Sequence, residues 1–292
     1  MATTITEAAR RLPSLLAAAS LAGLAACGGG GGSSGAPPVT LKGASFWTPS
    51  SDLDQAALRN IEGGSGGNFG SVIYIDDGFA QFLQEQTQSG PDGTNFFQQD
   101  GDNFAIVSTP DGQSPSQYSD IRFLRLVYVR GGELFVQDGI LGRFTSDTRM
   151  ALASGTATFT GVDSSEVLTR PSSGPTFDLL RGDVVAVADF DGGRVNVTLS
   201  DFAPSPNATF DEVRVNNMTI SGSSFRGGSL VVLQSGQPTG DFSGGDFQSS
   251  GLFAGWNDSN GTAAGGNIPA ELGGAFLAAT TDGTVVGRYA AD

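Results

Sequence analysis

The second half of the chain, residues 150–292, consists of short runs rich in β-branched and aromatic residues, separated by Gly, Asp, Asn and Ser. This spacing is typical of antiparallel strands that are joined by tight turns. The clearest hairpin joins residues 183–190 to residues 194–200, because Asp191-Gly192-Gly193 between them supplies the positive φ angles of a tight turn. The sequence therefore predicts a mainly β fold.

Alternation along these runs indicates that one face of each strand is buried, as where Val195, Val197 and Leu199 alternate with polar residues. We expect eight or nine strands, at residues 154–161, 177–180, 183–190, 194–200, 212–220, 229–234, 251–256, 273–279 and 284–290. Eight strands with short returns close the smallest β-barrel, and closure removes exposed sheet edges. An antiparallel eight-stranded barrel is the expected architecture, with a two-sheet sandwich as the alternative.

Glycine content and charge narrow the class of protein further. The chain contains 44 glycines and 20 phenylalanines, and the phenylalanines are spread along it, which argues against a disordered linker. The net charge of −15 repels phosphate backbones and so excludes nucleic acid as a partner. We interpret the acidity as a solubilising surface; an acidic face for a basic partner or a cation is the alternative.

The residues needed for most catalytic and metal-binding sites are missing. Histidine is absent and there is a single cysteine, so a histidine base, a thiolate cluster and an internal disulfide are all excluded. Asp76-Asp77-Gly78 and residues 100–103 resemble calcium loops superficially, but they lack the ligand spacing of an EF-hand and are interpreted as turns. We therefore expect no enzyme activity, no metal site and no cofactor.

The N-terminus has the features of a bacterial lipoprotein signal peptide, expected over residues 1–26. Two arginines precede an apolar stretch that ends in Leu24-Ala25-Ala26-Cys27, the pattern of a lipobox. Cleavage is expected between Ala26 and Cys27, with lipidation, including palmitate, at Cys27. The alternative is an ordinary signal peptide, cut for instance after Ala25, with an incidental cysteine.

A tether is expected over residues 27–38, because Gly and Ser dominate it and such segments behave as random coils. Two or more acyl chains give stable membrane attachment. Gly28 follows the cysteine in place of the aspartate that commonly retains lipoproteins at the inner membrane. We therefore expect the outer membrane as the destination.

Residues 39–149 carry fewer clear signals. Ser51, acidic residues in the first turn and apolar residues on one face predict a short helix over residues 51–61. Strands are expected at residues 71–75, 104–107 and 121–129, and Arg130-Gly131-Gly132-Glu133 turns the last of them into residues 134–136. Residues 79–83 fit either a strand or a helix.

Several segments resemble a known family in their order and spacing. They are Gly142-Arg143-Phe144-Thr145, Ser154-Gly155-Thr156-Ala157-Thr158-Phe159-Thr160-Gly161, residues 186–195, Gly251-Leu252-Phe253-Ala254-Gly255, Ala270-Glu271-Leu272-Gly273-Gly274-Ala275-Phe276 and Val285-Val286-Gly287. The chain resembles the transferrin-binding-protein-B-like surface lipoproteins over residues 142–292. It departs from them where a proline usually precedes the first barrel strand, at residues 150–153, and at Leu272, where Val or Ile is more usual.

The resemblance implies a handle domain over residues 39–149 and an eight-stranded barrel domain over residues 150–292, with the protein lipid-anchored and displayed outward. Members of this family bind proteins through loops that share no recognisable residues with this chain. No ligand-binding residue is therefore carried over, and the protein partner or solute stays unknown.

The leading functional hypothesis is a non-catalytic surface binding lipoprotein that presents loops such as Phe202–Phe210 and Gly236–Ser250. Phe242 and Phe247 are either exposed anchors of the kind that interfaces favour or side chains packed inward. The alternatives are a structural envelope lipoprotein without a specific ligand, and a carrier of a small ligand in the barrel. Haem is disfavoured as that ligand, because only Met or Tyr remains to bind its iron.

Overall fold

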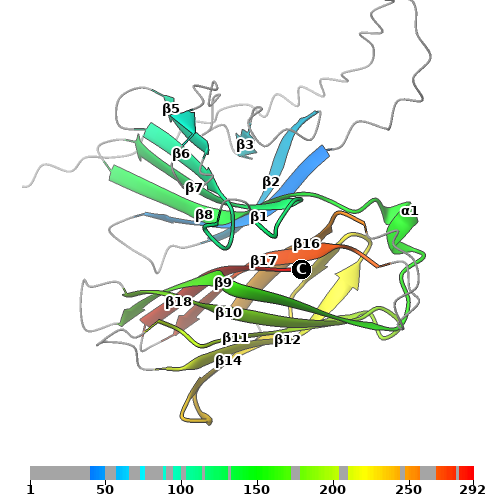
Figure 1. Ribbon diagram of the computed structural model, residues 1–292. Helices are drawn as coiled ribbons and strands as arrows, with labels where there is room; N and C mark the ends of the chain where they lie inside the picture. The colour runs from blue at the N-terminus through cyan, green and yellow to red at the C-terminus, as the bar shows by residue number, and fades with distance from the viewer. Residues whose placement is uncertain are drawn as a thin grey trace, which may run out of the picture. The chain divides into compact units, whose positions relative to one another are not determined.

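The computed structural model describes residues 40–49, 57–65, 73–75, 88–89, 95–99, 103–113, 116–130, 133–171, 178–203, 210–243, 247–256, 268–280 and 283–292. Strands dominate these residues, and the helix among them, α1 (Asp147–Met150), has four residues. Within the described part of the chain, no helix is long and apolar enough to cross a membrane. The predicted mainly β fold is confirmed (Figure 1).

The first part of the chain forms an eight-stranded antiparallel sheet, here called the N-terminal sheet, with the order β3-β2-β1-β8-β7-β6-β5-β4. Its strands are β1 (Thr40–Pro49), β2 (Ala57–Ser65), β3 (Ile73–Ile75), β4 (Gln88–Ser89), β5 (Asn95–Gln99), β6 (Asn103–Ser108), β7 (Ile121–Arg130) and β8 (Glu133–Arg143). The strands expected near residues 71–75, 104–107 and 121–129 are all present. Residues 79–83 lie outside the described residues.

The helix predicted over residues 51–61 is wrong for residues 57–61, which belong to β2; residues 51–56 lie outside the described residues. Leu58 is opposite Phe46 of β1, and Ile61 is opposite Ile75 of β3. Because β2 is paired along both edges, sheet hydrogen bonds override the weak local preference for a helix.

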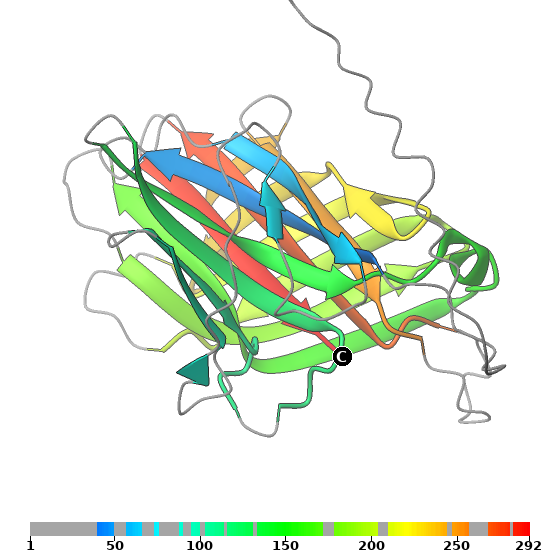
Figure 2. The same ribbon diagram turned by 90° about the horizontal axis from the view of Figure 1, so that it is seen from above.

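The second half of the chain forms the barrel (Figures 1 and 2). Its strands are β9 (Thr156–Pro171), β10 (Asp178–Asp189), β11 (Arg194–Ser200), β12 (Glu212–Ser221), β13 (Ser224–Arg226), β14 (Ser229–Gln234), β15 (Gln237–Ser243), β16 (Phe247–Ala254), β17 (Glu271–Thr280) and β18 (Gly283–Ala291). All pair antiparallel with their neighbours, and the β11–β12 pairing closes the ring. The predicted eight-stranded barrel is confirmed, and the alternative sandwich is wrong.

The barrel has ten strand segments but eight strand positions, because β13 and β14 share one position and β15 and β16 share another. β13 and β14 both pair with β12, and β16 and β15 pair with β13 and β14 respectively. β13 and β14 are separated by Gly227-Gly228, and both glycines have positive φ. A Cβ on Gly228 would lie 2.2 Å from the carbonyl oxygen of Asn216, so only glycine fits at this position.

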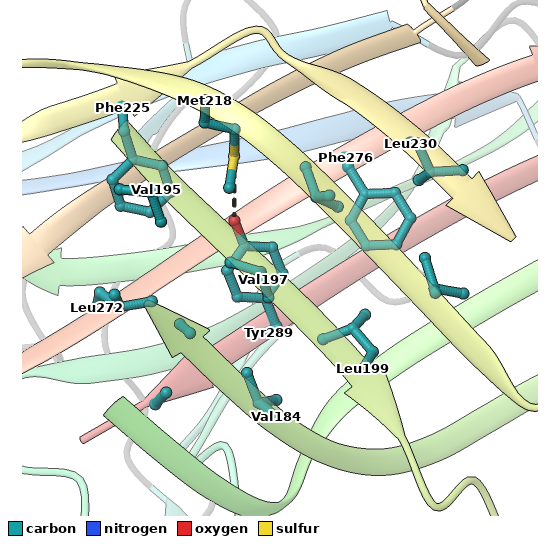
Figure 3. Close-up of a cluster of buried hydrophobic side chains, with 14 of the residues drawn as sticks. Val184, Val195, Val197, Leu199, Met218, Phe225, Leu230, Leu272, Phe276 and Tyr289 are labelled. Carbon is teal, nitrogen blue, oxygen red and sulfur yellow. Dashed lines mark hydrogen bonds between the residues drawn. The ribbon is translucent and has the colours of Figure 1, made fainter. Parts of the chain in front are cut away.

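The barrel interior is filled by side chains. Figure 3 shows part of this core, in which Tyr289 of β18 points toward Met218 of β12; its hydroxyl donates to the Met218 sulfur at 3.6 Å. Glycines make room for the rings: a Cβ on Gly251 would lie 2.2 Å from the Phe225 ring. The glycine-rich strands thus permit an aromatic core in a barrel of the smallest size.

A second apolar cluster covers the outer face of β16, β17 and β18, which are therefore buried on both faces. Tyr118, Ile121, Phe123 and Ile140 of the N-terminal sheet and its connection pack there against barrel residues Leu252, Ala254, Ala275, Leu277, Val286 and Ala290. Residues 38–292 form one compact unit. The division into domains at residues 149 and 150 stays a prediction.

Strand directions assign each barrel turn to one of two rims. β9, β11, β13 and β17 begin at one rim, which includes turns 190–193 and 222–223, residues 255–256, and α1 with its connection to β9. Leu41 of β1 pairs with Arg143, whose carbonyl accepts a hydrogen bond from the Gly255 amide, so the chain enters the described structure at this rim. We call it the tether rim, and the opposite one, where β9, β11, β14 and β17 end, the distal rim; its described connecting residues are 201–203, 210–211 and 235–236.

Candidate functional site

A buried ion cluster joins the barrel to the N-terminal sheet. Arg288 of β18 is 4% exposed, and its Nε lies 3.0 Å from Glu166 of β9. Its Nη1 lies 3.3 Å from Asp138 of β8 and donates to the Leu124 carbonyl of β7 at 2.8 Å. The guanidinium carbon also lies 4.5 Å from the centroid of the Phe123 ring. One side chain therefore contacts both sheets through charge, hydrogen bonds and a cation–π contact.

Glu166 faces outward from the barrel because side chains alternate along β9. Ala157 and Phe159 before the bulge and Val167 after it pack into the barrel core, whereas Glu166 meets Arg288 outside. The bulge lies at Asp163, which has a φ of 52° and whose amide donates to the Asp183 carboxylate at 2.9 Å where the β9–β10 register shifts. The register moves by two residues there, so the alternation is kept across the bulge.

Three guanidiniums hold Glu166 ionised. Burial by itself would raise the pKa of Glu166, but the charges of Arg288, Arg125 and Arg181 lower it to about 2. Arg181 lies 2.6 Å and Arg125 3.4 Å from the carboxylate. Arg125 also pairs with Asp138 at 2.6 Å. The cluster is therefore a network of paired charges and not an isolated ion pair.

A second buried carboxylate fixes the connection between β6 and β7. Glu271, at the start of β17, is 2% exposed and accepts hydrogen bonds from the Ser119 amide at 2.6 Å and the Asp120 amide at 3.0 Å. Burial raises the pKa of Glu271, and these hydrogen bonds offset part of the rise. Beside it, the Tyr118 hydroxyl donates to the Ala290 carbonyl at 3.0 Å. These contacts tie the N-terminal part of the chain to the barrel near the tether rim.

The polar groups of both clusters stabilise the fold. Their donors and acceptors are satisfied by one another, and no group of three or more His, Cys, Asp or Glu residues within the described ranges is placed to hold a metal ion. Arg288, Glu166 and Asp138 were not among the site residues predicted from the sequence. The sequence feature that could have identified Arg288 is its position in a strand of small and apolar residues, Val286-Gly287-Arg288-Tyr289-Ala290.

Acid is expected to remove the contribution of Glu166. Because the folded-state pKa is depressed, its stabilisation is present above the ordinary carboxyl pKa and is lost as pH falls toward about 2; it is on the order of 3 kcal/mol at neutral pH. Urea unfolding should show wild type and Glu166→Gln differing much more at about pH 6 than at about pH 2.5. Glu212→Gln, in a partly exposed pair with Arg214, is the control with a small difference at both values. A pH-independent difference for Glu166→Gln would contradict this assignment.

The residues predicted for lipidation and cleavage, Ala26 and Cys27, lie outside the described residues, as does Asp76-Asp77-Gly78. Phe247 is 5% exposed and packs in the barrel core, so the inward alternative is right for it. The Phe242 side chain is not among those described.

The distal rim carries the first of the two loops predicted from the sequence. The second prediction, a loop over Gly236–Ser250, is wrong for most of that segment, because Gln237–Ser243 form β15 and Phe247 begins β16. Phe202 and Phe210 stack edge to face with centroids 5.5 Å apart and pack on the barrel core, so both ends of the first loop are anchored; residues 204–209 between them lie outside the described residues. The distal rim also carries the short β14–β15 turn, where Ser235 and Gly236 have positive φ and the Asp211 carboxylate accepts from the Ser235 amide at 2.8 Å. Residues 234–239 are all exposed.

A closed eight-stranded barrel joined to an antiparallel sheet through buried ion pairs defines the architecture of this chain. No family model and no curated protein sequence matches it. Solved structures do: transferrin-binding protein B from Haemophilus parasuis, in a variant form, is 20% identical with a TM-score of 0.52, over 87% of this chain and 44% of that chain. Transferrin-binding protein B from Neisseria meningitidis is 14% identical with a TM-score of 0.48, over 86% and 43%.

The chain therefore has a fold similar to that of transferrin-binding protein B, as the sequence resemblance implied. At this identity the likeness concerns the fold alone. The chain spans less than half the length of these structures.

Proposed function

We propose that this chain is a non-catalytic binding protein, held on the outer membrane by a lipid at Cys27 and turned outward so that its distal rim contacts a protein partner. The proposal rests on the fact that the two rims lie at opposite ends of the barrel. The described chain begins at Thr40, beside the tether rim, while the ends of the Phe202–Phe210 loop and the β14–β15 turn lie at the distal rim. A tether at one end leaves the other end free to meet a partner.

The fold likeness supports this proposal, because the similar structures are named as transferrin-binding proteins. The distal rim also fits the role: the β14–β15 turn projects exposed polar residues, and the Phe202–Phe210 pair fixes the ends of a second loop. Rigid anchors with exposed loops between them are how many scaffolds present binding residues. A structural envelope role without a ligand is the competing hypothesis.

Replacement of Cys27 by alanine is expected to abolish incorporation of labelled palmitate and to release the chain from the membrane fraction, because the acyl chains provide the attachment. Metabolic labelling followed by fractionation checks both. In intact cells, external protease should remove the wild-type protein while a periplasmic marker survives. Protection of the wild-type protein would overturn the outward orientation and favour a role inside the envelope.

Partner contact is tested with a photo-crosslinking residue at Gln237, which is exposed beside the β14–β15 turn. Thr158, exposed on the barrel wall, is the matched control position. Adducts with another protein from Gln237 but not from Thr158 would support binding at the distal rim. Adducts from neither position, on cells exposed to the protein's natural surroundings, would favour the structural role.

A further inference from the structure

Apolar side chains gather at the tether rim. Leu152, between α1 and β9, is 58% exposed, and Phe190, Ile220 and Trp256 at the neighbouring turns are partly exposed. A single exposed leucine is ordinary for a soluble surface. The Leu152 amide donates to the carbonyl of Arg149, whose guanidinium lies near the partly exposed Trp256 ring, so both apolar side chains belong to the rim where the chain enters.

These residues belong to one connected surface. The Arg149 guanidinium of α1 lies 5.9 Å from the centroid of the Trp256 ring, and the Asp147 carboxylate accepts from the Ser223 amide at 3.0 Å. Close by, the Phe190 amide donates to the Gly155 carbonyl at 2.9 Å, which joins turn 190–193 to the connection after α1. The Phe190 ring in turn packs on Phe253 of the core, at 5.5 Å between centroids. The surface is therefore held by the barrel.

The charge of this rim is low for such an acidic chain. Its segments 147–155, 190–193, 222–223 and 255–256 carry two carboxylates and one guanidinium, from Asp147, Asp191 and Arg149, in a protein whose net charge is −15. At the adjoining strand ends, Asp189 pairs across from Arg194 and Asp120 pairs with Arg143, while the C-terminal Asp292 adds negative charge. A surface with only a small excess of negative charge beside tryptophan and leucine suits the boundary between zwitterionic headgroups and acyl chains. It suits neither nucleic acid nor a strongly charged protein.

The chain that precedes the described residues points to the same occupant. Twelve residues, 28–39, separate Cys27 from Thr40, and a Gly/Ser-rich coil of that length spans about 20 Å on average. A lipid at Cys27, which belongs to the proposed function, would therefore keep the tether rim within reach of the bilayer. Such tethering makes even a weak contact effective, because the local concentration is high.

We infer that the tether rim rests on the lipid surface, with Leu152 and Trp256 at the boundary between headgroups and acyl chains. This inference rests on the lipid anchor of the proposed function. As a consequence, the barrel stands on the membrane in one orientation, with the distal rim facing away from the bilayer.

The test uses the mature lipidated protein in zwitterionic phosphatidylcholine vesicles with and without bromine on the acyl chains. The chain has two tryptophans, Trp47 and Trp256, so Trp47→Phe and Trp256→Phe each isolate one emission. Trp47 lies seven residues along β1 from Thr40, about 23 Å, and serves as the internal control. Circular dichroism and the urea midpoint confirm that each variant is folded.

We expect brominated lipid to reduce Trp256 emission by about half, since a residue at this boundary is buried several ångströms into the membrane, and to leave Trp47 emission unchanged. Leu152→Ser should weaken the quenching of Trp256 while the protein still floats with the vesicles. Flotation with an unquenched Trp256 would overturn the inference alone. Failure to float would overturn the lipid anchor, and the inference with it.

Discussion

Arg288→Met is expected to lower the free energy of unfolding by about 3–5 kcal/mol, because it removes the most deeply buried of the guanidiniums that neutralise Glu166 and Asp138. It also deprives the Leu124 carbonyl of its hydrogen bond from the guanidinium. Methionine keeps most of the length and volume of the arginine stem, so the loss reports charge and hydrogen bonds more than packing. Urea unfolding measures it directly.

Two variants make this test selective. Arg214→Met removes a guanidinium from a half-exposed pair with Glu212 and should cost less than about 1 kcal/mol. Arg288→Lys keeps the charge but loses the planar fork that contacts both sheets, so its cost should lie between the two. Equal losses for Arg288→Met and Arg214→Met would show that the cluster does not hold the sheets together.

Phe253→Ala is expected to cost about 3–5 kcal/mol, because it opens a cavity at the centre of the barrel's aromatic core. The Phe253 ring is fully buried, with its centroid 5.1 Å from that of Phe225, 5.5 Å from that of Phe190 and 6.5 Å from that of Phe159. A closed ring of strands cannot collapse readily onto the space left behind. The urea midpoint should fall while the dependence on urea concentration stays similar.

Leu152→Ala provides the matched control, since this leucine is 58% exposed and its truncation should change stability by no more than about 0.5 kcal/mol. A loss below about 1 kcal/mol for Phe253→Ala would contradict the close packing of the core. The loss is also expected to be additive with that of Arg288→Met if the barrel core and the ion cluster are independent.

The sequence anticipated the barrel because the signals that specify it are local. Val195, Val197 and Leu199 alternate with polar residues and prove to be buried in the core, and the glycine turn before them falls where β10 meets β11. The same reasoning failed at residues 57–61, where a helical pattern of apolar residues lies in β2. Pairing with β1 and β3 is a long-range interaction that no local pattern reports.

The candidate sites divide in the same way. The lipobox around Cys27 is a contiguous motif and was found at once, although it stays a prediction. The ion cluster was missed because its members, Arg125, Asp138, Glu166 and Arg288, come from four strands, and a charged residue in a strand is ordinarily taken to face solvent. The β9 bulge at Asp163 also leaves little trace in the sequence.

By itself, the sequence determined the strand-and-turn character of the second half, its closure into a barrel and the absence of histidine and thiolate chemistry. Alternation and turn residues act between near neighbours, so they can be read from a single chain. Only the tertiary structure decided what covers the outer face of β16, β17 and β18. A strand's pattern separates its two faces but does not say what the second face will meet, and here the N-terminal sheet turned that face into a buried surface where charges must pair.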